Sequence, residues 1–422
     1  MLIGRGHKEG RLSDAEVHAL VKEALAGLDL GGKRVLALIP DSTRTAPVGL
    51  MFRALADGLE GRAAKLDFLI ALGTHRAMTE KQILRLLEMT AEERRSRYGR
   101  VEVFNHAWDD PKALQAIGTL SAREMDRLTE GRYARDVSVE INRRIFEYDH
   151  LLIVGPTFPH EVVGFSGGTK YLFPGICGAE FLNFFHWLGA LVTNWKTNGV
   201  KDTVVRRVIH RAAEFVQVPI TNFGLVVTRK GLKGLYIGDP KESWSAAADL
   251  SAQVHIRYMD RPFRKVLGIA PEMYDDLWTG AKVMYKLEPI VADGGDLIIY
   301  APHITEVSYT HGRMLDKIGY HCLDYFREQM DKFADVPGGV MAHSTHVKGL
   351  GTYCDAVEKP RIHVILATGI PEERCRRINL GYLDPREVRL AAWLNREDEG
   401  ILVVDHAGET LYRLKSQRDA PA

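Results

Sequence analysis

Cysteine is scarce in this sequence, and the few cysteines lie far apart. The chain has 422 residues and four cysteines, and no two of them form a Cys-x-x-Cys pair. Neither a disulfide framework nor a thiolate metal site is therefore indicated. We interpret Cys177, Cys322, Cys354 and Cys375 as buried thiols.

Long hydrophobic runs are also missing. No stretch reaches the roughly 20 apolar residues of a membrane span. Residues 1–17 lack the apolar core that is typical of a signal peptide. We therefore expect a cytoplasmic protein with no membrane partner.

Neither sign of charge is in excess. The 56 lysines and arginines nearly balance the 55 aspartates and glutamates. The sequence has no long block of like-charged residues, so a nucleic-acid partner is not expected. A chain of 422 residues is long enough for two domains that each bury a core.

Short apolar runs that alternate with helical patterns predict an α/β fold. Two of the helices are expected to begin at capping boxes, formed by Ser13 with Glu16 and by Thr79 with Gln82. The apolar runs are typical of parallel strands. In the first part of the chain they are residues 34–40, 66–73 and 149–155.

The same alternation restarts after residue 262, with a helical stretch over 277–291. The later apolar runs are residues 263–271, 293–302, 361–369 and 400–406. We predict an N-terminal α/β domain over residues 1–262 and a smaller C-terminal α/β domain over 263–422. Both are expected to have mainly parallel sheets, with the active site in the cleft between them.

Polar motifs follow the first three runs. They are DSTR (41–44), GTHR (73–76) and PTFPHEVVGFSGGTK (156–170). The carboxyl ends of parallel strands meet at one edge of a sheet, so these motifs are expected to converge there. Arg44 is placed to grip a carboxylate or phosphate, unless its motif is only a helix-starting turn. His75 stands where a catalytic base would stand, and a capping or solvated histidine is the alternative.

Two further motifs have a functional and a structural interpretation. GFSGGTK (164–170) has glycines that let backbone N–H groups approach an anion, or that only turn the chain. HSTH (343–346) has two imidazoles without a nearby third ligand. We interpret HSTH as a solvated or structural loop rather than a metal site.

Taken together, the motifs resemble the lactate racemase family, whose members use a nickel-pincer nucleotide. The resemblance rests on the order and spacing of DSTRTAP, GTHRAMTE, INRRIFEYDHLLIVGPTFPHEVVGFSGGTKYLFPGICG and the later His186. It covers most of residues 35–190 and continues more weakly over 278–302.

The resemblance implies roles for individual residues. Lys170 would be joined covalently to the cofactor, the nickel complex of pyridinium-3,5-bisthiocarboxylic acid mononucleotide. His186 would be the one protein ligand to nickel, because the pincer supplies the other three donors. His75 and His160 would be the acid/base pair. The remaining cofactor-binding residues would be Asp41, Thr43, Arg44, Ser166, Gly167 and Gly168.

The implied reaction is racemisation or epimerisation of a 2-hydroxy acid by reversible hydride transfer. One histidine takes the hydroxyl proton while hydride moves from the substrate carbon to the cofactor. The keto acid turns, hydride returns to its other face, and the second histidine supplies the proton. Each enantiomer thus needs its own base, and imidazole titrates near working pH.

The sequence departs from the family at the substrate site. The lactate enzymes carry a Gln-x-x-Lys pair, and the aligned residues here are Thr279 and Lys282. The expected substrate-binding residues are Arg44, Lys282, Thr279 and Trp187, with Trp278, His303 and His311 nearby in sequence. We expect a larger or more polar acid than lactate, such as a hydroxy dicarboxylate, an aryl-lactate or an aldonate.

Two other functions stay open. Lys170 could form a Schiff base with pyridoxal phosphate, or the chain could be a non-catalytic nucleotide- or anion-binding module. The expected partners are a small 2-hydroxy acid and the enzymes that make the cofactor, and assembly into a homo-oligomer is left open.

Overall fold

The computed structural model describes residues 2–417, which form two compact units. Within the described residues, unit 1 comprises 2–158, Phe165–Leu182 and Val204–Val254, and unit 2 comprises Pro159–Gly164, Asn183–Thr203 and 255–417. His160 and His186 therefore belong to unit 2, although the sequence placed them in the N-terminal domain. The boundary at residue 262 and the cleft between domains stay predictions.

Unit 1 is built on a seven-stranded sheet with the order β1-β11-β10-β7-β2-β3-β4. The strands are β1 (Ile3–Gly6), β2 (Arg34–Ile39), β3 (Lys65–Ile70), β4 (Val103–Asn105), β7 (His150–Pro156), β10 (Ile220–Thr228) and β11 (Gly231–Gly238). The neighbours from β10 to β4 are parallel, whereas β11 and β1 add an antiparallel edge. A separate antiparallel pair consists of β5 (Leu114–Leu120) and β6 (Val137–Asn142).

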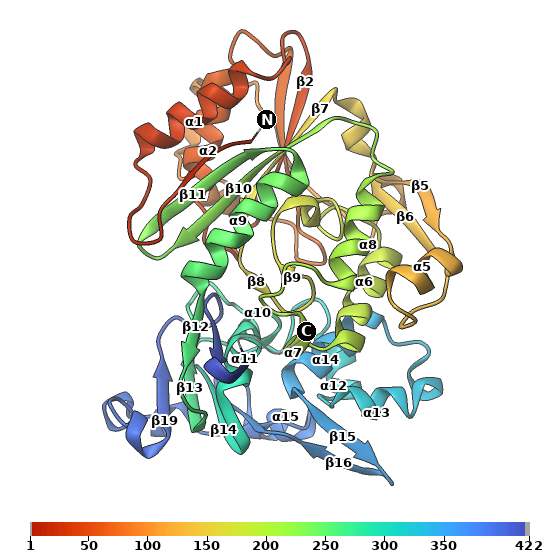
Figure 1. Ribbon diagram of the computed structural model, residues 1–422, viewed down its shortest axis with the longest axis vertical. Helices are drawn as coiled ribbons and strands as arrows, with labels where there is room; N and C mark the ends of the chain where they lie inside the picture. The colour runs from red at the N-terminus through yellow and green to blue at the C-terminus, as the bar shows by residue number, and fades with distance from the viewer. Residues whose placement is uncertain (1, 418–422) are drawn as a thin grey trace. The chain divides into compact units, whose positions relative to one another are not determined.

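Helices cover both faces of this sheet (Figure 1). The helices of unit 1 are α1 (Asp14–Ala26), α2 (Val48–Leu59), α3 (Glu80–Leu86), α4 (Ala91–Ser96), α5 (Ala122–Leu128), α8 (Val204–Ala213) and α9 (Pro240–His255). Val35, Ala37 and Ile39 alternate along β2 and share one core with α1 and α2. On the opposite face, Val226 of β10 packs with Leu250 of α9.

The local signals for unit 1 are confirmed. Ser13 and Glu16 form the capping box of α1, and Thr79 and Gln82 form that of α3. The three apolar runs are β2, β3 and β7. The sheet of unit 1 is therefore mainly parallel, as predicted.

Unit 2 has a five-stranded parallel sheet with the order β18-β17-β14-β13-β19. Its strands are β13 (Phe263–Ile269), β14 (Val291–Ala301), β17 (His363–Thr368), β18 (Gly381–Tyr382) and β19 (Ile401–Val404). Short pairs are β12 (Ile256–Met259) with β20 (Leu411–Leu414) and β15 (Gly351–Cys354) with β16 (Val357–Pro360). The prediction of an α/β fold with mainly parallel sheets is thus confirmed.

Helices α10 (Leu277–Gly280) and α11 (Lys282–Leu287) occupy the predicted helical stretch of unit 2. The other helices are α7 (Asn194–Thr197), α12 (Gly312–Ile318), α13 (Leu323–Arg327), α14 (Gly338–Lys348) and α15 (Glu372–Arg377). Helix α6 (Ala179–Val192) begins in unit 1 and ends in unit 2, and β8 (Pro159–His160) and β9 (Gly164–Phe165) flank residues 161–163.

Two sequence interpretations are wrong. HSTH is not a loop: it lies in α14, where His343 and His346 are buried. Cys354 is exposed, whereas the other three cysteines are buried as expected. The polar residues of HSTH gave no sign that they lie in a buried helix. Cys354 is exposed because it lies in a small two-stranded hairpin.

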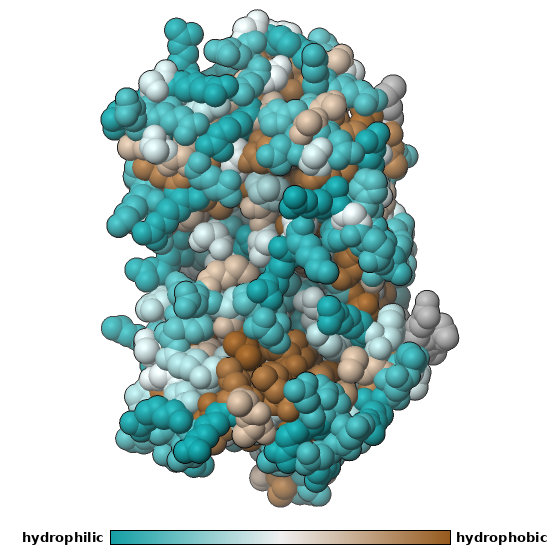
Figure 2. Space-filling view, turned by 90° about the vertical axis from the view of Figure 1, so that its left-hand side faces the viewer, coloured by the Kyte–Doolittle hydropathy of each residue, from teal (hydrophilic) through white to brown (hydrophobic). Residues whose placement is uncertain are grey.

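Most of the face in Figure 2 is hydrophilic, with a hydrophobic patch among the polar residues. Over residues 2–417, the exposed large hydrophobic side chains are Leu2, Phe146, Tyr309, Met330, Val357 and Leu394. None of the helices in that range is both long enough and apolar enough to span a bilayer.

Candidate active site

The structure brings Asp41 and His75 together at the carboxyl ends of β2 and β3. These strands are parallel neighbours, so the residues that follow them meet at one edge of the sheet. Asp41 Oδ2 lies 2.5 Å from His75 Nδ1. Asp41 is 6% exposed, whereas the His75 side chain is 29% exposed. The carboxylate thus holds the imidazole from the buried side.

The DSTR segment is ordered by Asp41 itself. Its Oδ1 accepts hydrogen bonds from the Thr43 backbone N–H at 3.0 Å and the Thr43 hydroxyl at 2.7 Å. Burial opposes ionisation of Asp41, but His75, Thr43 and Arg44 outweigh it and hold the pKa of the carboxyl well below its ordinary value. Asp41 is therefore the ionised partner in the pair.

The glycines of the SGGTK segment are required by the packing of unit 1. Gly167 has φ +81° and Gly168 has φ +59°, which is the region that favours glycine. A Cβ on Gly167 would lie 2.6 Å from the Thr157 hydroxyl oxygen, and one on Gly168 would lie 2.9 Å from the Trp244 ring. Tight packing thus accounts for both glycines before any ligand is considered.

Ser166 anchors the same segment to the end of β7. Its hydroxyl donates to the Pro156 carbonyl at 2.9 Å and accepts from the Phe158 N–H at 2.8 Å. Lys170 follows in a 3-10 turn that spans Gly168–Tyr171. The cofactor-binding roles of Ser166, Gly167 and Gly168, and the tethering role of Lys170, stay predictions.

Sequence reasoning missed two residues that support this segment. The Arg206 guanidinium donates to the backbone carbonyls of Phe165 and Gly167, and the Trp244 indole donates to the Ser166 carbonyl at 2.8 Å. Arg206 also stacks over the Trp244 ring at 4.2 Å, and burial lowers its pKa to about 9. A buried arginine and tryptophan on helices far along the chain gave no motif by which to find them.

In unit 2, His160 is almost fully buried, at 6% exposure. Its Nδ1 accepts a hydrogen bond from the Val162 backbone N–H at 3.1 Å. Glu161 Oε2 lies 3.5 Å from the same nitrogen. The Nδ1 atom of His160 therefore faces residues 161 and 162 of the same loop.

His186 and Trp187 lie on the part of α6 that belongs to unit 2. The glycine pair Gly338–Gly339 begins α14 and allows it to pack closely against α6. A Cβ on Gly338 would lie 3.0 Å from Trp187 Cβ, and one on Gly339 would lie 3.9 Å from His186 Nδ1. The Gly339 N–H also donates to Asn183 Oδ1 at 3.1 Å. Close helix packing thus positions the proposed nickel ligand.

Thr279 lies on α10, and Lys282 is the first residue of α11. The Thr279 hydroxyl and backbone N–H each lie 3.0 Å from Asp276 Oδ1, which caps α10. Lys282 Nζ lies 4.6 Å from the centre of the Tyr274 ring. Thr279 thus has a structural contact that the sequence did not indicate, and the substrate-binding roles of both residues stay predictions.

The Trp278 ring contacts the imidazole rings of two histidines from other parts of unit 2. Its ring stacks on His343 with centroids 4.1 Å apart and an angle of 4°. The His311 ring lies 4.6 Å away. His303 is held elsewhere, with its Nε2 donating to the Tyr274 carbonyl at 3.0 Å. His303 thus contacts the backbone, whereas His311 and His343 extend the aromatic group, and substrate contacts of His303 and His311 stay predictions.

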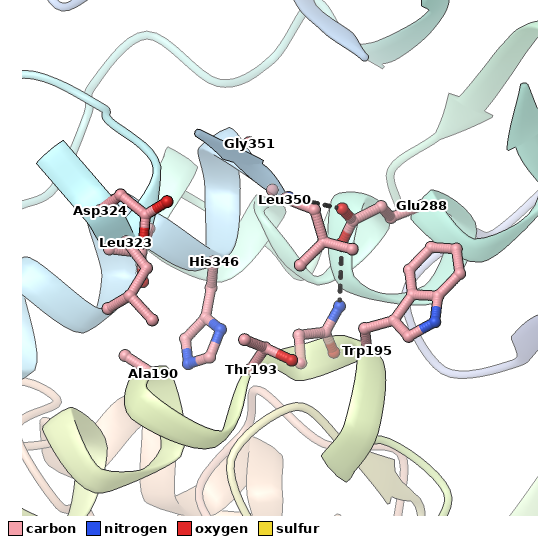
Figure 3. A pocket seen from close by; sticks show the side chains of 12 residues that line it. Ala190, Thr193, Trp195, Glu288, Leu323, Asp324, His346, Leu350 and Gly351 are labelled. Carbon is pink, nitrogen blue, oxygen red and sulfur yellow. Dashed lines mark hydrogen bonds between the residues drawn. The ribbon is translucent and has the colours of Figure 1, made fainter. Parts of the chain in front are cut away.

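A cavity of about 110 Å³ in unit 2 is lined in part by His346 and Glu288. In Figure 3, the His346 ring points from α14 toward Ala190 and Thr193. Glu288 accepts from the Leu350 N–H at 2.9 Å and from Asn194 Nδ2 at 3.3 Å. Burial lowers the pKa of His346 to about 4 and raises that of Glu288. The neutral form of the His346 ring is therefore favoured near neutral pH.

Residues 12–198 match the lactate racemase N-terminal domain. This segment includes Asp41, His75, His160, Lys170 and His186, so it covers the motifs on which the resemblance rests. This part of the chain is therefore similar to the N-terminal domain of lactate racemases. The family resemblance predicted from the sequence is confirmed, while Thr279 and Lys282 lie beyond the matched residues.

Individual relatives extend the comparison. A lactate racemase from Thermoanaerobacterium thermosaccharolyticum is 27% identical over 180 residues, which span 42% of this chain and only 38% of that protein. A crystal structure of a protein from Thermotoga maritima is 34% identical, with a TM-score of 0.88 over 96% of this chain and 99% of that one. The lactate racemase apoprotein from T. thermosaccharolyticum shares the fold, with a TM-score of 0.71 at 18% identity over 97% of this chain and 94% of that one.

Proposed function

We propose that the protein is a racemase or epimerase of a 2-hydroxy acid that is larger or more polar than lactate. The observation that carries this proposal is the family match over residues 12–198, which includes the whole proposed acid/base, tether and metal set. The contact between Asp41 and His75 supports it, because an imidazole held by a carboxylate is suited to proton transfer.

The metal donors that the protein offers are compatible with the nickel-pincer nucleotide of the lactate racemase family. Across residues 2–417, no group of three or more His, Cys, Asp or Glu side chains is arranged to hold a metal ion. A pincer that brings three donors needs only one imidazole from the protein, and His186 is the proposed donor. Lys170 is the proposed covalent attachment point. When bound, that cofactor would supply the hydride acceptor and donor for the substrate carbon.

The protein's own groups move the protons and hold the substrate. His75 and His160 are the proposed acid/base residues for the substrate hydroxyl, each serving one enantiomer. The Asp41 carboxylate stabilises the imidazolium that forms when His75 takes a proton. Arg44 and Lys282 are the proposed cations for the substrate carboxylate.

The test is reconstitution of the protein by co-expression with the enzymes that make the cofactor. Intact mass and nickel content establish loading, and chiral chromatography then follows both enantiomers of lactate, malate, phenyllactate and a 2-epimeric pair of aldonates. We expect interconversion of at least one larger acid at a higher kcat/KM than lactate. A fully loaded, nickel-containing protein that interconverts none of them would overturn the proposal.

The same preparation separates the alternatives. His186→Ala should keep the organic adduct and lose nickel, because the pincer would lack its fourth donor. An aldimine absorbance band after incubation with pyridoxal phosphate would favour the Schiff-base function instead. Binding of the nucleotide without turnover of any acid would favour the non-catalytic binding module.

A further inference from the structure

The environment of His75 fixes where its proton lies. An ionised carboxylate only accepts hydrogen bonds, and Asp41 Oδ2 is 2.5 Å from His75 Nδ1. Nδ1 must therefore carry a hydrogen. In the neutral imidazole the other nitrogen, Nε2, then has a lone pair.

The environment of His160 has the opposite effect. A backbone N–H can only donate, and the Val162 N–H points at His160 Nδ1 from 3.1 Å. Glu161 Oε2 also lies near Nδ1, but at 3.5 Å it is beyond the usual range of an N–H to O hydrogen bond. Nδ1 is therefore the acceptor, and the hydrogen of neutral His160 lies on Nε2.

We infer that the resting protein holds its two acid/base histidines in opposite tautomers, His75 with the proton on Nδ1 and His160 with the proton on Nε2. Resting on the proposed function, this gives them unequal roles. His75 presents a lone pair at Nε2 and accepts a hydroxyl proton directly. His160 presents an N–H at Nε2, so it donates a hydrogen bond and must change its protonation before it acts as a base.

The change at His160 has a definite structural cost. Protonation of Nδ1 removes the acceptor of the Val162 N–H, and a buried N–H that loses its acceptor destabilises that state. The protonated Nδ1 would face Glu161 Oε2 instead, at 3.5 Å. The Val162 bond and the Glu161 carboxylate thus favour different protonation states of the same ring.

The tautomers can be read in the full-length protein without cofactor or substrate. Imidazole-labelled ¹⁵N-histidine is incorporated, and long-range ¹H–¹⁵N correlation at pH 8 distinguishes the two tautomers of each ring. The chain has 16 histidines, so His75→Asn and His160→Asn serve to assign the signals. The Asn oxygen or amide stands where Nδ1 was, so each variant keeps the local hydrogen bond and is expected to fold.

We expect the Nε2–H pattern for His160 and the Nδ1–H pattern for His75. An Nδ1–H pattern for His160, or the same tautomer for both rings, would overturn the inference. If an Asn variant does not fold, the corresponding Gln variant provides the assignment. Because no turnover is measured, a protein that later proves inactive as a racemase would count against the proposed function and leave the tautomers standing.

Discussion

The carboxylate of Asp41 lies 2.5 Å from Nδ1 of His75, and this contact joins residues that follow two neighbouring strands, β2 and β3. The other carboxylate oxygen is engaged by Thr43. The two oxygens of Asp41 therefore have separate roles, because Oδ1 orders the loop and Oδ2 sets the tautomer of the histidine.

Asp41→Asn is predicted to reverse the tautomer of His75. The amide oxygen can still accept from Thr43, while the amide NH₂ would face Nδ1 and make it an acceptor. Nε2 would then carry the proton and could not accept one, and turnover should fall by about 10²–10⁴. The measurements are imidazole ¹⁵N correlation on the unloaded protein and kcat/KM on the loaded one. Thr43→Ser, which keeps the hydroxyl, should retain the wild-type tautomer.

Lys170→Ala is predicted to abolish covalent loading while the fold is kept. Lys170 lies in a short 3-10 turn, and Gly167, Gly168 and the Ser166 hydroxyl hold the segment that leads into it. Intact mass after co-expression with the cofactor enzymes, together with the unfolding temperature, tests both statements. The wild-type mass adduct on the variant would show that the attachment point is elsewhere, and Lys196→Ala is a lysine control outside this segment.

Local chemistry explains why much of unit 1 could be predicted from the sequence. Apolar runs such as 34–40 fill both faces of a buried strand, and capping residues such as Ser13 act within one helical turn. The contact of Asp41 with His75 follows from the adjacency of two parallel strands, which the motifs already suggested.

The remaining features depend on contacts between residues that are distant in sequence. Arg206 holds the carbonyl of Gly167 from 39 residues further along the chain, and no local pattern marks such a pair. HSTH looks polar in sequence, yet the neutral imidazole of His346 is buried in a helix. Strand β11, which lies between β1 and β10, has too many glycines to stand out as an apolar run.

Thr279→Gln is predicted to raise the preference for lactate relative to larger acids, if the missing amide distinguishes this chain from the lactate enzymes. The Thr279 hydroxyl also bonds Asp276, so the variant should lose about 0.5–1.5 kcal/mol of stability. Thr279→Val is the matched control, because it loses the same hydroxyl without gaining an amide. Competition between lactate and the best larger acid gives the ratio of kcat/KM, and an equal ratio in both variants would contradict the prediction.

His106 is predicted to make the protein less stable in mild acid. Its Nε2 donates to the Cys177 carbonyl and its Nδ1 accepts from Asn142 Nδ2, both at 3.0 Å. Burial lowers its pKa from 6.5 to about 4. The unfolded chain therefore binds the proton more readily, and stability falls as the pH drops below 6.5 toward 4, by up to about 1.4 kcal/mol per pH unit.

The measurement for His106 is denaturant unfolding at pH values from 7.5 to 5. His106→Gln should be less stable at pH 7.5, because Asn142 loses its acceptor, but its stability should depend less steeply on pH. An unchanged slope would show that His106 does not carry this part of the acid sensitivity.

The half-reactions of the loaded enzyme test the division of labour between His75 and His160. Net racemisation needs both residues, so His75→Asn and His160→Asn should each block it. In a single turnover, each variant should still oxidise the one enantiomer that its remaining histidine serves, and the two variants should prefer opposite enantiomers. Removing a positioned acid/base costs about 10²–10⁴ in rate, so stopped-flow absorbance of the cofactor with each pure enantiomer resolves the pattern.

The two residual half-reactions should also be unequal. In His160→Asn, the remaining His75 accepts the hydroxyl proton at a lone pair that Asp41 keeps available. In His75→Asn, the remaining His160 must first lose the hydrogen bond that its Nδ1 accepts from the Val162 N–H, because Nδ1 has to take up a proton before Nε2 can act as a base. The oxidation served by His160 should therefore be the slower one, by about tenfold for each 1.4 kcal/mol that this rearrangement costs. Equal rates in the two variants would mean that the tautomer of His160 does not limit its action as a base, and equal losses for both enantiomers in both variants would point to a single shared base.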